Sequence, residues 1–301
     1  MKAILIYNPA AGRNPARRRE EMRSAVAILR RAGIETEVVK TAGQGSAKEF
    51  ARQALARGLE MVIVCGGDGT INEAVNGMAG RAIPLAVLPG GTANTLAREL
   101  GLPQHPVAAA KRLPQWRPRP IPLGRARWSV GGRPRERYFL SLAGAGFDAQ
   151  VVRELSLDYK VRLGVMAYVG EALEQVWRYR FPKFICRADG RDYAATFALA
   201  QRTRLYGGWF QIAPQADFFK PALTGCLFQS AARARYLTYA LALIFRQHTR
   251  LKDVAFVESV SISCQPATPE SVIYFELDGE LVGQLPVVFD AVPEALTLMA
   301  P

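Results

Sequence analysis

Four short apolar runs alternate with helix-like segments over the first 120 residues, and this alternation limits the available folds more than any other feature of the chain. The runs that read as strands cover residues 2–7, 35–40, 61–65 and 84–88. Strands that alternate with helices form a parallel sheet whose two faces are covered by those helices. The first part of the chain is therefore expected to fold as an α/β domain.

The segments between these runs carry the periodicity of amphipathic helices. Ser46 with Glu49 and Thr70 with Glu73 match the capping box, in which a hydroxyl and a carboxylate lie three residues apart at a helix start. Helices are therefore predicted to begin at these two boxes. In the first helix an apolar stripe leaves four basic residues that are expected to face water: Arg17, Arg18, Arg19 and Arg23.

The pattern changes from about Pro118, where short alternating runs broken by glycine and proline begin. Such runs are typical of antiparallel strands, and two helices interrupt them near 160–179 and 232–249. The segment QWRPRPIPLG marks a boundary, because proline resists both helix and central strand. We expect an α/β domain over 1–120 and a β-rich sandwich domain over 121–301, with the C-terminal residues free to pack back on the first domain.

Composition limits the class of protein. Half of the 301 residues are hydrophobic and 22% are charged, a balance typical of globular proteins. No apolar run is long enough to span a bilayer and the N-terminus lacks the features of a signal peptide, so a cytoplasmic protein is expected. The four cysteines are far apart and the two histidines stand alone, which argues against a zinc site or a disulfide framework. The formal charge of +13 favours anionic partners: nucleic acid, an anionic membrane or a polyphosphate.

Three glycine-containing loops follow predicted strands of the first domain: NPAAGR, GGDGT and PGGTAN. In an open α/β sheet, ligands bind beyond the carboxyl ends of the strands. Glycine lets backbone N–H groups approach an anion, so three such loops predict a phosphate cradle, although each alone is also an ordinary turn. Asp68 lies in the second loop, and an acid there repels phosphate unless a cation intervenes. This points to Mg²⁺ shared with a nucleotide triphosphate.

GGDGTINEAVNG followed by LPGGTANTLAREL resembles the catalytic domain of the diacylglycerol kinase family of lipid kinases, in the bacterial branch that is also similar to sphingosine and ceramide kinases. YNPAAGR, SLAGAGFDAQVV, YGGWFQIAP and FELDGE fall in the family's order, so the resemblance covers nearly the whole chain. GGDGT alone is shared with NAD kinases and phosphofructokinases, whereas GGTAN, GFDA and LDGE make the resemblance specific. It implies an α/β domain like that of NAD kinases and phosphofructokinases, a lipid-substrate domain, and phosphoryl transfer from ATP to a lipid hydroxyl.

The resemblance also implies an ATP site in the first domain, where Asp68 would hold the Mg²⁺ of the nucleotide. Taken without the family, Thr41 is an ordinary strand-end hydroxyl and Asn72 is an ordinary first-turn residue. The residues that the resemblance assigns to the ATP site are Asn8, Pro9, Ala10, Ala11, Gly12, Thr41, Gly66, Gly67, Asp68, Gly69, Thr70, Ile71, Asn72 and Thr92.

The LDGE segment raises a separate chemical point. A lipid hydroxyl is a poor nucleophile, so a carboxylate must accept its proton as the phosphoryl group transfers. Asp278 and Glu280 flank a glycine, which is also the pattern of a hairpin turn. The resemblance implies that this segment carries the catalytic base, which we assign to Glu280 with Asp278 as its partner or replacement. It also places Asp148 at the lipid head group, although this residue could instead cap the helix that follows.

One segment departs from the family. After IAPQAD the family typically has an acidic stretch that holds a structural Mg²⁺, whereas this chain reads FFKPALTG, with Phe219 and Lys220 where acids are expected. A lysine ammonium could replace the charge of the ion but not its coordination geometry. We therefore predict that this accessory metal site is absent and that activity is weaker or differently organised.

A lipid kinase takes its substrate from a bilayer, so basic and exposed apolar residues should coincide. The segment 117–137 holds seven arginines and one acid, with Trp116 and Trp128 nearby, which suggests peripheral contact with an anionic membrane. The helix around YLTYALALIFRQHTR reads either as a core helix or as a wall of the lipid site.

Two other functions remain open. An NAD kinase-like enzyme would explain GGDGT but not GGTAN or the long apolar second domain. A non-catalytic nucleotide- or lipid-binding protein of the same fold is supported by the altered FFKPAL segment. Nucleic acid is not expected as a partner, because no motif of a known nucleic-acid-binding module is found. The leading expectation is a role in lipid metabolism and phospholipid biosynthesis, and a homodimer is left open.

Overall fold

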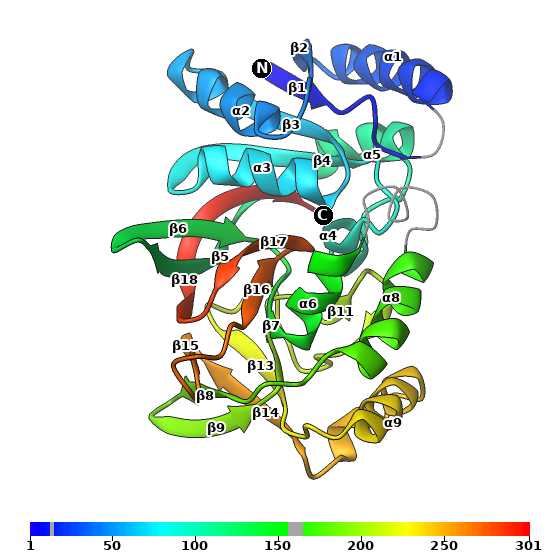
Figure 1. Cartoon of the computed structure of the whole chain (residues 1–301). Helices are drawn as coiled ribbons and strands as arrows, with labels where there is room; N and C mark the ends of the chain where they lie inside the picture. The colour runs from blue at the N-terminus through cyan, green and yellow to red at the C-terminus, as the bar shows by residue number, and fades with distance from the viewer. Residues whose placement is uncertain (13–14, 156–164) are drawn as a thin grey trace. The chain divides into compact units, whose positions relative to one another are not determined.

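The computed structural model describes residues 1–12, 15–155 and 165–301, which form two compact units (Figure 1). Unit 1 contains Met1–Leu123 and Pro293–Pro301, and unit 2 contains Gly124–Val292.

Unit 1 is a parallel α/β sheet with the strand order β2-β1-β3-β4-β18. Its strands are β1 (Lys2–Tyr7), β2 (Glu35–Lys40), β3 (Met61–Gly66), β4 (Arg81–Pro89) and the end of β18 (Val287–Ala300). Its helices are α1 (Pro15–Arg31), α2 (Ser46–Ala56), α3 (Asp68–Met78), α4 (Thr95–Glu99) and α5 (Pro106–Arg112), followed by the 3₁₀ turn η1 (Leu113–Gln115). α2 packs beside α3 and α1 beside α5 (Figure 1). β3 is buried along its whole length, as expected for a strand covered on both faces, so the predicted parallel sheet is confirmed.

The capping-box prediction is wrong at both helices. α2 does begin at Ser46, but Ser46 Oγ accepts hydrogen bonds from the amides of Ala42 (3.2 Å) and Gly43 (3.1 Å), which close the preceding loop. α3 begins at Asp68, two residues before Thr70. Glu73 Oε2 accepts a hydrogen bond from Ala47 N at 3.2 Å, in the first turn of α2. Because α2 and α3 are packed together, this carboxylate stabilises the start of the neighbouring helix rather than its own.

Unit 2 is built from antiparallel strands. One sheet has the order β14-β13-β10-β7-β16-β17 and consists of β7 (Leu142–Gly146), β10 (Phe197–Gln201), β13 (Leu223–Phe228), β14 (Val254–Ser259), β16 (Tyr274–Leu277) and β17 (Glu280–Gln284). The other strands are the end of β5 (Arg117–Val130), β6 (Arg133–Phe139), β8 (Phe184–Ala188), β9 (Arg191–Ala195) and β15 (Ser261–Pro266), with the first part of β18 paired to β15. A short hairpin of β11 (Leu205–Tyr206) and β12 (Phe210–Gln211) stands apart. The predicted class, an α/β domain followed by a β-rich sandwich, is confirmed.

Helices cover part of unit 2: α6 (Phe147–Glu154), α8 (Val165–Arg178), α9 (Arg233–Ile244) and the 3₁₀ turn η2 (His248–Arg250). The first residues of the helix predicted near 160–179 lie outside the described residues, and α8 accounts for most of the rest of that range. α9 buries Tyr236 and Tyr239, whereas Leu241 and Ile244 are exposed, so the core-helix interpretation holds only for part of it. Within the ranges that the structure describes, no helix combines the length and apolarity needed to cross a membrane.

Candidate functional site

Hydrogen bonds bring the three glycine loops of unit 1 together at the carboxyl ends of β1, β3 and β4. Asn8 Nδ2 donates to Thr70 Oγ1 at 2.8 Å, which ties the first loop to the start of α3. Gly90 N donates to Gly66 O at 2.9 Å, which ties the third loop to the second. The sheet edge predicted from strand order therefore carries all three loops in contact.

The glycines of these loops allow two backbones to touch. A Cβ atom added at Gly91 would lie 2.5 Å from Gly67 Cα, and one added at Gly66 would lie 2.7 Å from Thr70 Cβ. Real Cβ atoms do not approach other atoms so closely, so a side chain at Gly91 would push the third loop off the second, and one at Gly66 would displace the Thr70 side chain of its own loop. The abundance of glycine around Asp68 thus has a packing cause, in addition to any contact with phosphate.

The other residues predicted for the ATP site differ in what they expose. Asn8 Oδ1 accepts from Ala10 N at 2.9 Å and shapes the first loop, while Thr41 N donates to Tyr7 O at 2.9 Å beside it. Ile71 and Asn72 are buried, each 1% exposed, so their side chains lie inside unit 1. Pro9, Ala10, Ala11, Gly12, Gly69 and Thr92 lie on the loops and are half-buried or exposed.

Asp68 stands at the start of α3 with its carboxyl directed at another helix. Burial raises the pKa of this carboxyl, and hydrogen bonds from the backbone amides of Thr95, Leu96 and Asn94 oppose part of that rise. These amides form the N-terminus of α4, so Asp68 holds the third loop in place.

The second oxygen of Asp68 bears on the predicted metal. Asp68 Oδ1 is shielded from water and has no hydrogen-bond partner among the described residues. Mg²⁺ at nucleotide sites keeps several waters and takes one or two carboxylates beside phosphate oxygens, so one unpartnered carboxylate oxygen fits such an ion. The described ranges contain no cluster of three or more acidic, histidine or cysteine side chains that would hold a metal without phosphate.

Two residues of this edge were missed by sequence reasoning. Arg18 was expected to face water, but its guanidinium donates to Gly90 O at 2.7 Å, and a Cβ atom at Gly12 would lie 2.5 Å from its Nη2. This prediction is wrong because α1 starts beside the loops rather than away from them. Asn94 adopts the left-handed conformation (φ 49°) and its Oδ1 accepts from Gly91 N at 2.8 Å, which fixes the turn of PGGTAN.

In unit 2 the LDGE segment is a hairpin turn. Asp278 (φ 49°) and Gly279 (φ 81°) connect β16 to β17, and Leu277 pairs with Glu280 across the turn. Positive φ at both central residues is the geometry that Asp-Gly favours, so the turn interpretation of this segment is correct. The two flanking acids nevertheless have different partners.

Asp278 is engaged by the backbone, whereas Glu280 is held by a side chain. Asp278 Oδ2 accepts from Leu140 N at 2.8 Å, and its Oδ1 accepts from Ser141 N at 2.8 Å and Leu142 N at 3.0 Å. This carboxylate anchors the start of β7 to the turn. Glu280 Oε2 accepts from the guanidinium of Arg137 on β6, and the Glu280 side chain remains 28% exposed.

Asp148 lies in the first turn of α6 but does not cap it. The helix has no side-chain cap, with Gly146 at its N-cap position, so the capping interpretation is wrong. The Asp148 carboxyl is buried and its Oδ1 accepts a hydrogen bond from the Tyr206 hydroxyl. Gly144 beneath it could not carry a side chain, since a Cβ atom there would lie 2.1 Å from Asp148 Oδ2.

The segment that departs from the family is organised by an arginine that sequence reasoning missed. The buried guanidinium of Arg202 donates to the carbonyl oxygens of Lys220 (2.6 Å), Ala222 (2.9 Å) and Phe218. Lys220 itself pairs with Glu258 on β14. The cation that gathers these carbonyls therefore comes from the end of β10 and not from Lys220.

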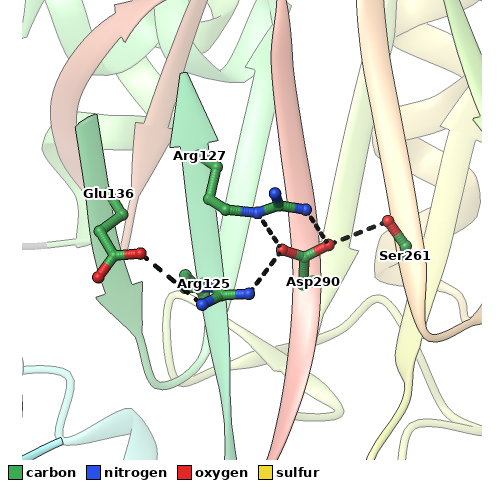
Figure 2. Close-up of polar contacts among 5 residues, drawn as sticks. All are labelled: Arg125, Arg127, Glu136, Ser261 and Asp290. Atoms are coloured by element: carbon green, nitrogen blue, oxygen red, sulfur yellow. Dashed lines mark hydrogen bonds and ion pairs between the residues drawn. The ribbon is translucent and has the colours of Figure 1, made fainter. Parts of the chain in front are cut away.

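The arginine-rich segment is less free than its sequence suggests. The Arg127 guanidinium donates to the Asp290 carboxylate through Nε (2.6 Å) and Nη2 (3.1 Å). Arg125 and Ser261 donate to the same carboxylate (Figure 2). Burial alone would raise the pKa of the Asp290 carboxyl, but hydrogen bonds from Arg127 and Ser261 hold it below its usual range. Neither tryptophan of this region projects as an anchor, because Trp116 is 4% exposed and Trp128 packs edge-on against Phe275 at 5.4 Å.

The chain thus combines an α/β unit, whose three glycine loops are joined, with a β-rich unit that carries an acidic hairpin. Residues 2–126 match the diacylglycerol kinase catalytic domain, and residues 141–300 match the YegS C-terminal NAD kinase beta sandwich-like domain. The chain belongs to the diacylglycerol kinase family, and membership of this family supports a kinase, a transferase of phosphoryl groups.

Two relatives agree with this family, and a solved structure agrees with its fold. The chain is 31% identical to a protein of Mycobacterium tuberculosis strain H37Rv named diacylglycerol kinase, over all of this chain and 95% of that protein. It is 28% identical to the diacylglycerol kinase of Bacillus subtilis strain 168, over 96% of this chain and 92% of that one. A crystal structure of a diacylglycerol kinase from Bacillus anthracis strain Sterne matches all of this chain with a TM-score of 0.77 at 24% identity, which supports the fold.

Proposed function

We propose that the protein is an ATP-dependent lipid kinase that transfers the γ-phosphoryl group of ATP to a hydroxyl of diacylglycerol or a related lipid. The observation that carries this proposal is the junction of three glycine loops around Asp68, one oxygen of which is buried without a partner. The names of the relatives support the class of acceptor.

Unit 1 is the proposed donor side. Glycine loops at helix N-termini offer backbone N–H groups to phosphate, and the guanidinium of Arg18 adds positive charge beside Gly12 and Gly90. Asp68 Oδ1 is the proposed ligand, direct or through water, of the Mg²⁺ that accompanies the nucleotide. When bound, this ion neutralises charge on the transferring phosphoryl group.

Glu280 is the proposed catalytic base. Both oxygens of Asp278 accept hydrogen bonds from backbone amides. Glu280, the first residue of β17, has a partly exposed side chain. Glu280 takes the proton of the lipid hydroxyl as that oxygen forms a bond to the γ-phosphorus, and the bond from phosphorus to the leaving oxygen of ADP breaks. Asp278 is then a positioning residue, and Asp148 is proposed to face the lipid head group.

Peripheral contact with an anionic membrane is part of the proposal, and the end of α9 supports it better than the segment 117–137 does. Leu241, Ile244 and Phe245 are 57%, 58% and 70% exposed, and the exposed Arg246 follows them. Exposed apolar side chains beside a basic one suit the interface of an anionic bilayer. Sedimentation with anionic and neutral vesicles tests this: Phe245→Ser should weaken binding, whereas Val130→Ser, on β5 of the arginine-rich segment, should not. The opposite result would favour the arginine-rich segment.

The absence of an accessory metal remains a prediction, and the three carbonyls gathered by Arg202 support it. A non-catalytic nucleotide- or lipid-binding protein and an NAD kinase-like enzyme are the competing functions. Homodimer formation also remains a prediction, which light scattering after size-exclusion chromatography would test.

One assay separates these functions. Radiolabelled ATP is supplied with diacylglycerol, monoacylglycerol, phosphatidylglycerol, sphingosine and NAD, and the reaction is repeated with Glu280→Gln and Asp68→Ala. We expect a labelled lipid that both variants fail to produce. Label on NAD alone would replace the proposal with NAD kinase activity, and label on no acceptor would favour the binding protein.

A further inference from the structure

Two buried carboxyl groups of unit 2 face each other above a glycine. Asp148 comes from α6, and Glu276 comes from β16, where it pairs with Gly144 of β7. A Cβ atom at Gly144 would lie 2.1 Å from Asp148 Oδ2 and 2.7 Å from Glu276 Oε1, so both oxygens use the space that glycine leaves. Asp148 is 3% exposed and Glu276 is 0% exposed.

Two oxygens so placed, Asp148 Oδ2 and Glu276 Oε1, can share a hydrogen bond. Ionised carboxylates only accept hydrogen bonds, so such a bond requires one proton on the pair. Both facing oxygens, Asp148 Oδ2 and Glu276 Oε1, are shielded from water and have no hydrogen-bond partner among the groups that the structure describes. Burial raises the pKa of both carboxyls, and the charge of Asp148 raises the pKa of Glu276 further.

The outer oxygens show which partner keeps the proton. The Tyr206 hydroxyl donates to Asp148 Oδ1, so Asp148 accepts on both oxygens and suits the ionised role. Gly279 N donates to Glu276 Oε2 at 2.6 Å, which leaves Oε1 to carry the proton toward Asp148. Each of the four carboxyl oxygens then has one hydrogen-bond partner.

We propose that Glu276 is a positioning residue of the acceptor side, which stays protonated, donates from Oε1 to Asp148 and accepts the Gly279 amide at Oε2. One side chain thereby ties the carboxylate of Asp148 to the turn that leads directly into Glu280. The catalytic meaning of this inference rests on the proposed lipid kinase function, whereas the shared proton does not.

The groups around the pair are consistent with one negative charge. Tyr206 on β11 and Tyr168 on α8 interact with it, and burial raises the pKa of both hydroxyls, so neither adds a negative charge. Asp278 adds negative charge on the side of the turn, and Glu280 belongs to the same hairpin. Two arginines on neighbouring elements are engaged elsewhere: Arg137 with Glu280, and Arg153 over the ring of Tyr274 at 4.5 Å.

Infrared spectroscopy of the whole protein tests the proton itself. At about pH 7, where ordinary carboxyl groups are ionised, we expect the absorption of a protonated carboxyl group in the wild type and its loss in Glu276→Gln. Glu270→Gln, at an exposed residue, is the matched control and should leave the band in place. A wild-type spectrum without the band, or a band that survives Glu276→Gln, would overturn the inference, and neither result depends on kinase activity.

Kinetics test the positioning role. Glutamine can donate to Asp148 and accept from Gly279 as the protonated acid does, so Glu276→Gln should lower kcat/KM for the lipid by no more than about 5-fold. Glu276→Ala should lower it by about 50-fold, within the range seen for residues that orient catalytic groups, while the KM for ATP stays unchanged. Equal losses in the two variants would show that an ionised acid is needed, and no loss in Glu276→Ala would show that the side chain does not position the site.

A wild type that phosphorylates no lipid would defeat the proposed function and leave the infrared result to decide the shared proton alone. A wild type that is active, without the carboxyl band, would defeat the inference and leave the proposed function intact.

Discussion

The two acids of the LDGE hairpin should separate into a stabilising residue and a catalytic one when each is changed to its amide. In Asp278→Asn the side chain keeps its shape and its tolerance of positive φ. The amide nitrogen would face Leu140 N, which now donates to Asp278 Oδ2 at 2.8 Å, and two donors cannot satisfy each other. The bonds from Ser141 N and Leu142 N would lose the charge of their acceptor.

The cost follows from these three bonds. A buried amide left without an acceptor costs about 1–3 kcal/mol, and weakening two charge-assisted bonds adds about 1 kcal/mol. A loss of about 3 kcal/mol lowers the melting temperature of a unit of this size by roughly 6–12 °C. Glu280→Gln breaks only a partly exposed pair with Arg137, worth less than about 1 kcal/mol, so its melting temperature should change by less than about 4 °C.

Thermal unfolding and the lipid kinase assay are measured on the same preparations. Glu280→Gln should lose about 10²- to 10⁴-fold in kcat, the range for a general base, while its melting temperature stays close to that of the wild type. Asp278→Asn should show the larger fall in melting temperature and the smaller fall in kcat. If Asp278→Asn melted with the wild type and lost activity as Glu280→Gln was expected to, the roles assigned to the two acids would be exchanged.

Four further predictions follow from contacts elsewhere. In urea titrations, Gly91→Ala should lower the free energy of unfolding by about 1–3 kcal/mol, because its Cβ would press on Gly67 Cα. Gly43→Ala, where a Cβ atom would meet no other atom, should change it by less than about 0.5 kcal/mol. Equal effects of the two substitutions would refute the packing argument. Arg202→Met removes the donor from three carbonyl oxygens and should lower the free energy of unfolding by about 2–4 kcal/mol. Lys220→Met breaks only a half-exposed pair with Glu258 and should lower it by less than about 1 kcal/mol. A larger effect at Lys220 would argue against Arg202 as the cation that organises this segment. Protein purified without nucleotide should contain no stoichiometric Mg²⁺ by elemental analysis, and one bound ion per chain would contradict that prediction. Because folding raises the pKa of Glu276, this residue stabilises the protein below the unfolded pKa of about 4.3, and the stabilisation is lost as pH rises toward the folded pKa. Above about pH 4.3 the free energy of unfolding of Glu276→Gln should therefore increase relative to that of the wild type, by at most about 1.4 kcal/mol per pH unit. A difference between the two proteins that stays constant from about pH 5 to 7 would be incompatible with the raised pKa.

The layout of unit 1 could be predicted because each signal is local. β1 and β2 have the bounds that the apolar runs indicated, and the loops with their glycines follow directly from strand ends. The capping boxes failed because their side chains had partners outside their own helix: Ser46 turned back on its loop and Glu73 reached Ala47 of α2. The spacing of residues along one helix cannot reveal a hydrogen-bond partner that lies outside that helix.

Arg18 and Arg202 were missed for a related reason. Arg18 reads as a solvated charge in the sequence and nothing there singles out Arg202, since a buried arginine is recognised only by the carbonyls that accept its hydrogen bonds. Gly90, which receives Arg18, lies 72 residues away, and Phe218, Lys220 and Ala222 lie 16 to 20 residues from Arg202. The family comparison drew attention to Lys220, which stands where acids are expected, but the carbonyls select the longer guanidinium because its forked donors can reach several of them at once.

Glu276 shows the limit of strand alternation as a guide. Its neighbours Phe275 and Leu277 are buried, so the period of two places Glu276 on the opposite face of β16, where a charged residue normally meets water. In this chain α6 packs over β16 and β7, and Glu276 is as buried as its neighbours. A glutamate in such a position is tolerable only if it is neutral or paired, and Asp148 and Gly279 provide both conditions. The acidic residue that the sequence pattern would assign to solvent is therefore the one whose protonation connects the α6 carboxylate to the LDGE turn.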